Sequence, residues 1–243
     1  MGAALLPLMA SDLSVKMLAA KMLDTSLTQS QRNDACFSLR GDASADAIEA
    51  NSRGLRDPKV RSCAEENLRR AGSIGVLTTA IQDDNPDVRA SAARTLGTFE
   101  RPELAPIIAK AGDDSQLLVA TNAIEGLSYY QDRSAVPYLL VLAKKTGIIG
   151  SLAVEQLIKL KEPKVLELAR GELLNSQEPA DLLAAMRVLG SMGDRSDIPT
   201  LEGLGKRFNE PVTATQGRGF GLMPAISIGR AANSSIEQIR SRP

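Results

Sequence analysis

The chain has 243 residues, with 29 Lys and Arg, 29 Asp and Glu, and no His. A net charge of zero argues against binding to nucleic acid or to an anionic membrane through overall electrostatics. The missing His excludes Ser-His-Asp and Cys-His catalysis, His-ligated zinc and His general-base chemistry. Hydrophobic residues make up 43% of the chain and aromatic residues only 3%. This composition favours a folded helical protein over a β-rich one.

The chain begins with an apolar segment at residues 1–10. The segment is too short to span a membrane, and it has no basic stretch before it. We expect part of a helix at 4–10 and a second helix at 13–23. Residues 1–27 are therefore predicted to form an incomplete unit without membrane insertion.

From residue 28 to residue 207 the sequence repeats with a period of about 30 residues. A leucine that ends one type of helix recurs once in each period, and its spacing changes only slightly from one repeat to the next. These anchor leucines are Leu39, Leu68, Leu96, Leu127, Leu157 and Leu189. After each anchor comes a polar turn, and the next apolar residue follows at eight or nine positions. Each period therefore predicts two antiparallel helices of about 10 to 12 residues.

The first helix of one repeat shows the pattern most clearly. Val88, Ala92, Ala93 and Leu96 form an apolar stripe with helical spacing. Small alanine side chains let neighbouring helices approach closely. Capping residues followed by proline, as at 84–86, indicate where such helices start.

The turns between paired helices repeat as well. Residues 132–137 (DRSAVP) match residues 194–199 (DRSDIP), which lie two repeats further along the chain. Ser134 and Ser196 are predicted to cap the helices that follow.

Residues 84–97 (DNPDVRASAARTLG) resemble the HEAT repeat of the phycobilisome-lyase type, in which D-x-x-P-x-V-R-x-x-A-A-x-A-L-G opens each unit. Residues 57–68 are similar to it more loosely. Ala120, Gly150 and Leu182 replace the motif arginine in later units, so no uniform Asp–Arg ladder is expected along the whole array.

This resemblance implies an all-α fold, a right-handed α-solenoid of about seven short HEAT-like helix-hairpin repeats. We expect a single repeat domain over residues 1–243. Its parts are the incomplete unit at 1–27, six regular repeats at 28–207 and a degenerate unit at 208–243.

The sequence fragments that look catalytic do not meet the requirements of catalysis. Residues 225–229 (AISIG) resemble a nucleophile elbow, but no His is present to act as base. The glycines at 217–221 follow the pattern GxGxG, which favours a loop over a dinucleotide site. We therefore expect no catalytic residue, no cofactor and no metal.

Basic residues gather at the ends of second helices, and two adjacent tyrosines lie in a turn. The basic residues either form a rim that binds an acidic partner or stabilise the helices by placing positive charge at the negative C-terminal ends of their dipoles. The tyrosines either bind a partner or pack against the next turn. The candidate partner-binding residues are Lys110, Tyr129, Tyr130, Lys144, Lys145, Arg170, Lys206 and Arg207.

The two cysteines, Cys36 and Cys63, lie in the first helices of successive repeats. They are too few for a closed zinc site. They are either small buried hydrophobes or a disulfide between the first two repeats. We expect a cytoplasmic protein, and an exported one if the disulfide forms.

These observations predict a non-enzymatic scaffold that binds an unknown protein or peptide, with an acidic partner in one interpretation. Its binding face would be a concave surface of second helices. One alternative is a subunit of a phycobilin-lyase-like enzyme, which the family resemblance suggests. The other is a nucleic-acid-binding HEAT-like protein, which zero net charge and few aromatics disfavour. The oligomeric state stays open.

Overall fold

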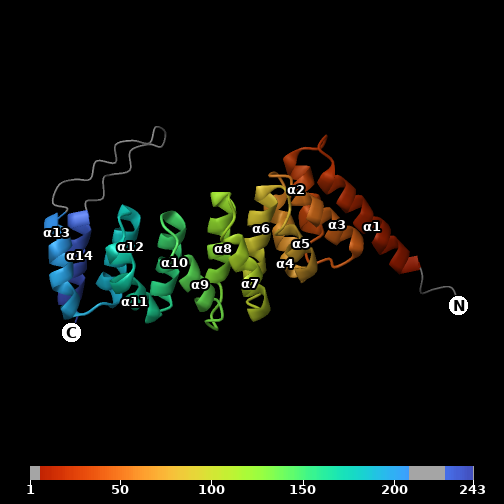
Figure 1. The fold of residues 1–243 in the computed structure, drawn as a ribbon. Helices are drawn as coiled ribbons and strands as arrows, with labels where there is room; N and C mark the ends of the chain where they lie inside the picture. Colours follow the sequence, from red (N-terminus) through yellow and green to blue (C-terminus); the bar gives the residue numbers. More distant parts are fainter. Residues whose placement is uncertain (1–5, 208–227, 243) are drawn as a thin grey trace. The chain divides into compact units, whose positions relative to one another are not determined.

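The computed structural model describes residues 6–207 and 228–242, and within this part it contains α-helices and short 3-10 helices but no strand. The chain divides into two compact units, unit 1 (Met1–Ala135) and unit 2 (Val136–Pro243). Each unit is a series of helix hairpins (Figure 1). The predicted all-α solenoid of HEAT-like hairpins is thereby confirmed.

Unit 1 contains eight α-helices in its described part. They are α1 (Leu6–Leu23), α2 (Gln29–Ser38), α3 (Ala45–Gly54), α4 (Arg61–Arg70), α5 (Ile74–Ala80), α6 (Pro86–Gly97), α7 (Ala105–Ala111), which follows the 3-10 helix η1 (Pro102–Leu104), and α8 (Leu117–Ser128).

Unit 2 contains six α-helices in the residues that the structure describes. They are α9 (Val136–Leu142), α10 (Ile148–Lys159), α11 (Lys164–Gly171), which precedes η2 (Leu173–Asn175), α12 (Pro179–Met192), α13 (Ile198–Arg207), which follows η3 (Arg195–Asp197), and α14 (Ile228–Arg240).

The N-terminal helix differs from the prediction. Two helical pieces were expected there, but α1 is one continuous helix of 18 residues. No Pro or Gly lies between residues 8 and 23, so nothing in this stretch interrupts the helical hydrogen bonds.

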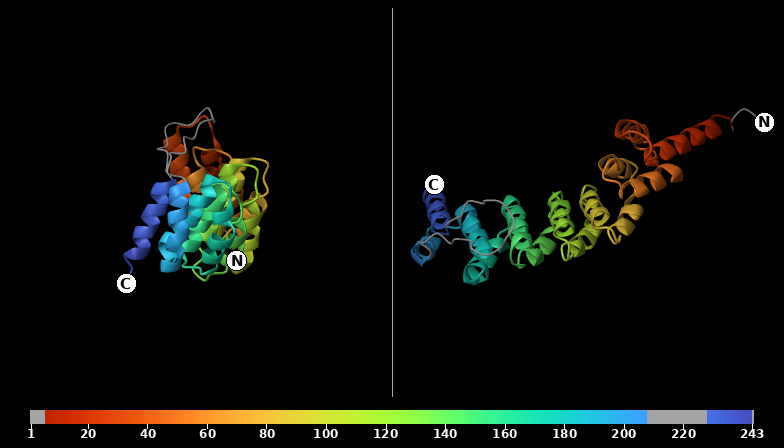
Figure 2. Two further views of the ribbon diagram at one scale, coloured as in Figure 1. Left: turned by 60° about the vertical axis from the view of Figure 1, so that its left-hand side comes forward. Right: turned by 90° about the horizontal axis from the view of Figure 1, so that it is seen from above.

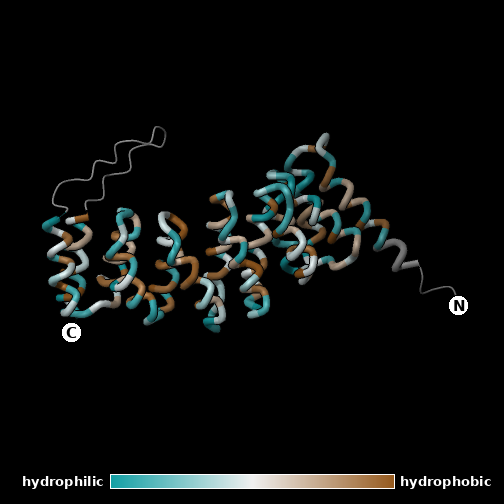
Figure 3. The backbone as a smooth tube through the Cα atoms, viewed as in Figure 1, coloured by the Kyte–Doolittle hydropathy of each residue, from teal (hydrophilic) through white to brown (hydrophobic). Residues whose placement is uncertain are grey.

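The helices of each unit form two layers. The even-numbered helices are the predicted first helices; α4, α6 and α8 contact one another in succession in unit 1, as α10, α12 and α14 do in unit 2. The odd-numbered helices from α3 to α13 are the predicted second helices, and each packs against the first helix that follows it in the chain, as α13 does against α14 in both views of Figure 2. Along each helix, hydrophobic and hydrophilic stretches alternate, as amphipathic packing requires (Figure 3).

The anchor leucines form the core between the layers. All six, Leu39, Leu68, Leu96, Leu127, Leu157 and Leu189, are fully buried. The predicted repeat register is therefore confirmed at each of them.

Helices α6 and α8 approach each other at their backbones. A Cβ atom placed on Gly97 would lie 2.1 Å from the carbonyl oxygen of Gly126. Ala92 and Ala93, on the same helix as Gly97, are fully buried. The predicted close approach through small side chains is thus present, and at its tightest point only glycine fits.

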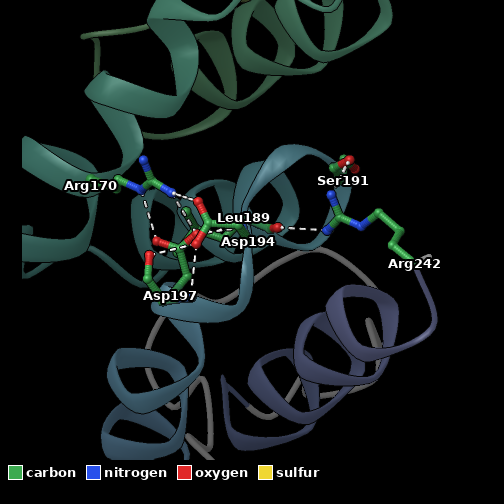
Figure 4. Close-up of polar contacts among 7 residues, drawn as sticks. Arg170, Leu189, Ser191, Asp194, Asp197 and Arg242 are labelled. Carbon is green, nitrogen blue, oxygen red and sulfur yellow. Dashed lines mark hydrogen bonds and ion pairs between the residues drawn. The ribbon is translucent and has the colours of Figure 1, made fainter.

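The predicted domain boundaries stay a prediction. Most of the degenerate unit expected at 208–243 lies outside the described residues, and so does the predicted loop at 217–221. Within unit 2, α14 packs against α12 and α13. Arg242, which follows α14, donates hydrogen bonds to the carbonyls of Leu189 and Ser191 at 3.3 and 3.2 Å (Figure 4).

Candidate functional site

The predicted basic positions do lie at the ends of odd-numbered helices. Five of them are exposed, and Lys145 is half-buried. They occupy the last turns of α7, α11 and α13 or directly follow α9: Lys110, Arg170, Lys206, Arg207, Lys144 and Lys145. Binding of a partner by these residues stays a prediction.

Lys144 and Arg170 form ion pairs within unit 2. Lys144 Nζ lies 2.6 Å from Glu172 Oε1. Arg170 donates to Asp197 at 2.8 Å and to Asp194 at 3.0 Å (Figure 4). Hydrogen bonds to Asp197 raise the pKa of Arg170 above its ordinary value. These ion pairs therefore connect successive hairpins. They also partly neutralise the positive charges of Lys144 and Arg170, which weakens the attraction of these residues for an acidic partner.

The two adjacent tyrosines have different environments. Tyr129 is half-buried, and its hydroxyl lies 3.3 Å from Glu125 Oε1. Tyr130 is fully buried, and its hydroxyl donates to the carbonyl of Arg101 at 2.9 Å. Of the two predicted alternatives for the tyrosines, packing is therefore the one present at Tyr130, a core residue that ties the end of α8 to the turn before α7.

Unit 1 contains a ladder of arginine–aspartate pairs between successive repeats. Its members are Arg32 with Asp57, Arg61 with Asp87 at 2.9 Å, and Arg89 with Asp114 at 2.7 Å. Each arginine also donates to a backbone carbonyl ten or fewer residues before it. The ladder follows the motif arginine and stops where Ala120 replaces it, as the sequence predicts.

A charged pocket lies over α4, α6 and the C-terminal cap of α8, with a volume of about 210 Å³. All eight side chains that line it carry a charge or a hydroxyl group, and six of the eight lie on α4 or α6. The lining residues are Ser62, Glu65, Glu66, Arg69, Arg94, Thr95, Thr98 and Tyr129. We call this set the charged pocket.

Each carboxylate in the charged pocket has an arginine partner. Glu65, whose side chain is 11% exposed, pairs with Arg94 from the next even-numbered helix. Glu66 accepts hydrogen bonds from Arg69 at 2.8 and 2.9 Å, and these bonds lower the pKa of Glu66 to about 2. Glu66 is therefore ionised at neutral pH.

The sequence reasoning missed this pocket apart from Tyr129. A usable signal was present, because Glu65 and Arg94 are opposite charges 29 residues apart, which is one repeat. Residues one repeat apart on stacked helices are neighbours in space.

The predicted cysteine pair is a disulfide. Cys36 on α2 is bonded to Cys63 on α4, with their Cα atoms 6.3 Å apart. This distance lies within the usual range for a disulfide. Of the two predicted alternatives, the bridge between the first repeats is the one that is present.

No group of three or more His, Cys, Asp or Glu residues in the described part of the chain is arranged to hold a metal ion. Both cysteines are bonded to each other. Among the described helices, none is long and apolar enough to cross a membrane.

Comparison with known proteins identifies both the repeats and an enzyme relative. Residues 74–149 match the model of HEAT repeats. Deoxyhypusine hydroxylase of Aspergillus clavatus is 32% identical over 153 residues, which cover 56% of this chain and 46% of the relative. The match thus spans about half the length of that enzyme.

Two solved structures are similar over most of their length but only weakly in shape. Human deoxyhypusine hydroxylase in complex with glycerol has a TM-score of 0.41 at 14% identity, covering 98% of this chain and 99% of that one. The complex of CpcE and CpcF of phycocyanin lyase from Nostoc sp. PCC7120 has a TM-score of 0.43 at 16% identity, covering 93% and 94%. Neither likeness bears on activity.

The relative overturns the prediction of a non-enzymatic scaffold. That prediction relied on the absence of His and assumed that all necessary chemistry would lie within this chain. A curated relative with 32% identity is an enzyme, so the interpretation as a scaffold without enzymatic function is wrong. By its matched repeats and its helix hairpins, this chain is a HEAT-like repeat protein.

Proposed function

We propose that this chain is the substrate-binding part of an enzyme related to deoxyhypusine hydroxylase. The charged pocket binds the substrate, and the reacting group is supplied from outside this chain. The observation that carries the proposal is the low-exposure carboxylate of Glu65 in a pocket of about 210 Å³.

The charged pocket suits a substrate that carries an amine. Deoxyhypusine is an amine-bearing amino acid, and a carboxylate is the group that binds a protonated amine most strongly. Glu65 is shielded from water, which strengthens its attraction for a cation. Arg94, its present partner, is 37% exposed, so water can solvate the guanidinium when an amine takes its place.

The polar groups around these carboxylates give such a substrate further contacts. Thr98 and Tyr129 line the same pocket and carry hydroxyl groups that accept or donate hydrogen bonds. A substrate amine at Glu65 would therefore meet both charge and hydrogen-bonding partners.

A metal centre for hydroxylation does not fit this chain. Non-haem iron oxygenases hold iron with two His and one carboxylate, and the chain has no His. Glu65 and Glu66 are each held by arginine. The oxidising group must therefore come from outside this chain, and we assign no chemical step to its residues.

The proposal is tested with a fluorescent peptide that carries deoxyhypusine and a matched peptide that carries lysine. We expect the intact chain to bind the deoxyhypusine peptide more tightly, as measured by fluorescence anisotropy. Glu65→Gln should weaken this binding about tenfold, because a hydrogen bond to a charged group contributes roughly 1.5–3 kcal/mol.

Glu178→Gln is the matched control, because Glu178 is exposed at the start of α12 and its side chain makes no capping hydrogen bond. Equal binding of the two peptides, or equal loss in both variants, would contradict the substrate role. Hydroxylated peptide formed by the purified chain alone, detected by mass spectrometry, would contradict the assignment of the reacting group to another chain.

The disulfide bears on the compartment in which the protein works. We propose an oxidising compartment, because disulfides persist there and are rare in the cytosol. Mass spectrometry of protein from its native source, alkylated before reduction, should find Cys36 and Cys63 linked. Two alkylated thiols would favour the cytoplasm, as first expected.

A further inference from the structure

The two halves of the disulfide differ in their access to solvent. Cys36 is fully buried between α2 and α4, whereas Cys63 is partly exposed. A thiolate that attacks a disulfide must reach one sulfur along the S–S axis, so access decides which sulfur is attacked. The incoming group therefore meets Cys63, and Cys36 becomes the leaving group.

The buried sulfur has a hydrogen-bond donor beside it. Asn67 Nδ2 lies 3.5 Å from Cys36 Sγ, 2.8 Å from the Cys36 carbonyl oxygen and 3.0 Å from Asn51 Oδ1. Asn67 is 1% exposed, so water does not compete strongly for its amide. Asn67 Nδ2 has two N–H groups for these three acceptors, so Cys36 Sγ shares one of them. An N–H group beside the sulfur stabilises the thiolate that forms when the S–S bond breaks.

One polar atom of the same asparagine lacks a hydrogen-bond partner while the disulfide is intact. Asn67 Oδ1 is buried and has no hydrogen-bond partner. An unsatisfied buried acceptor destabilises the state that contains it. Asn67 lies one helical turn after Cys63 on α4, and Asn51 Oδ1 lies 4.0 Å from Cys36 Sγ. Reduction creates an S–H donor on Cys36 beside Asn51 Oδ1.

We propose that Cys36–Cys63 is a thiol–disulfide exchange site, with Cys63 as the attacked sulfur and Asn67 as the residue that stabilises Cys36 as leaving group. A dithiol reductant attacks Cys63 Sγ through one thiolate and forms a mixed disulfide. The electron pair of the old S–S bond goes to Cys36 Sγ, which then takes up a proton.

The second thiol of the reductant completes the exchange. It attacks its own sulfur in the mixed disulfide and releases Cys63, which also takes up a proton. The protein gains two electrons and two protons, and the dithiol becomes a disulfide.

Other contacts hold the two helices together after reduction. Arg32 on α2 pairs with Asp57, which precedes α4. The hydrogen bond from Asn67 to the carbonyl of Cys36 also joins α4 to α2 and does not need the S–S bond. The exchange can therefore proceed within a folded unit 1.

The site of attack is tested on the unaltered protein. It is treated with an excess of glutathione, quenched with acid, digested and mapped by mass spectrometry. We expect the glutathione adduct predominantly on Cys63. Equal adducts on both cysteines, or an adduct on Cys36 alone, would show that the native geometry does not direct the attack.

The role of Asn67 is tested by the rate of reduction with dithiothreitol under native conditions. Asn67→Ala should be reduced several-fold more slowly than the unaltered chain, because the thiolate loses its donor. Asn51→Ala is the matched control: it removes a buried amide from the same cluster but no donor to sulfur, and it should not slow reduction.

A merely structural role predicts the opposite direction. If the amides only support packing, both variants loosen α2 against α4 and both speed up reduction, which would overturn the proposal. In concentrated urea all three chains should be reduced at one rate, because the native geometry is absent there. A difference that persists in urea would also count against the proposal.

Discussion

Glu66 is held by two arginines of its own helix. Arg69 and Arg70 both donate hydrogen bonds to it, and the first lies at 2.8 Å. The side chain is 33% exposed, so solvent screening reduces what this cluster contributes to stability. Its main effect is on the charge state of the charged pocket.

The titration of Glu66 gives a pH-dependent contribution to stability. Arg69 lowers the pKa of Glu66 from 4.5 to about 2 in the folded chain. A depressed carboxyl pKa stabilises the fold above the unfolded value, and this stability is lost as pH falls from 4.5 through 2.

The free energy of unfolding, measured with urea, should therefore favour the unaltered chain over Glu66→Gln at pH 6. This advantage should shrink as pH falls through the same window. A difference between the two chains that is independent of pH would contradict the assigned charge interaction.

The sequence predicted the core and the cap at Asn85 before Pro86 correctly, but the caps at Ser134 and Ser196 wrongly. The anchor leucines were predictable because burial follows the helical period. Ser134 and Ser196 were predicted as caps, but the carboxylates of Asp132 and Asp194 accept hydrogen bonds from their backbone N–H groups instead. Asp and Ser are equally good caps, so sequence alone does not choose between neighbours.

At the scale of elements, the backbones of α6 and α8 lie in close contact where the two helices cross. This closeness depends on Gly97 and Gly126, whose missing side chains leave room for the facing backbone. The fully buried anchors Leu96 and Leu127 adjoin these two glycines, so added volume there must displace core residues.

Gly97→Ala should destabilise the protein by about 1–3 kcal/mol, because its Cβ would lie 2.1 Å from the Gly126 carbonyl oxygen. Urea unfolding measures the change. Gly75→Ala on α5 is the matched control, since no atom lies within 4 Å of its Cβ position and alanine favours a helix. A neutral Gly97→Ala would show that α6 and α8 can separate without cost.

The partners of Arg170 show what sequence reasoning could and could not supply for the candidate site. The positions of the basic residues at helix ends were predictable from the repeat. Their ion pairs with Asp194 and Asp197 depend on which turn of the next hairpin comes within reach. The spacing between anchor leucines is not constant along the chain, so the sequence does not fix that reach.

At the scale of the whole molecule, the chain consists of two compact units. In repeat proteins each hairpin contacts mainly its neighbours, so a local defect spreads over a limited distance. The arginine–aspartate ladder lies wholly within unit 1.

Leu96→Ala should destabilise unit 1 by about 2–5 kcal/mol, because it leaves a cavity at a fully buried anchor. Hydrogen exchange should then rise more in α6 and α8 than in α10 and α12. Leu189→Ala is the counterpart in unit 2 and should show the reverse pattern. Uniform acceleration along the chain in both variants would contradict local unfolding.

Tyr130 makes the stability of unit 1 decrease at alkaline pH. Burial raises the pKa of its hydroxyl from 10.0 to about 12, so the folded state disfavours the phenolate. The stability that this preference confers is complete below pH 10 and is lost as pH rises through 12. The chain has no Trp and only three Tyr, so phenolate absorbance comes from these three side chains alone. Phenolate absorbance that forms well below pH 12 in the unaltered chain but not in a Tyr130→Phe chain therefore reports opening at the end of α8, and gives an optical signal of unit 1 without any attached label.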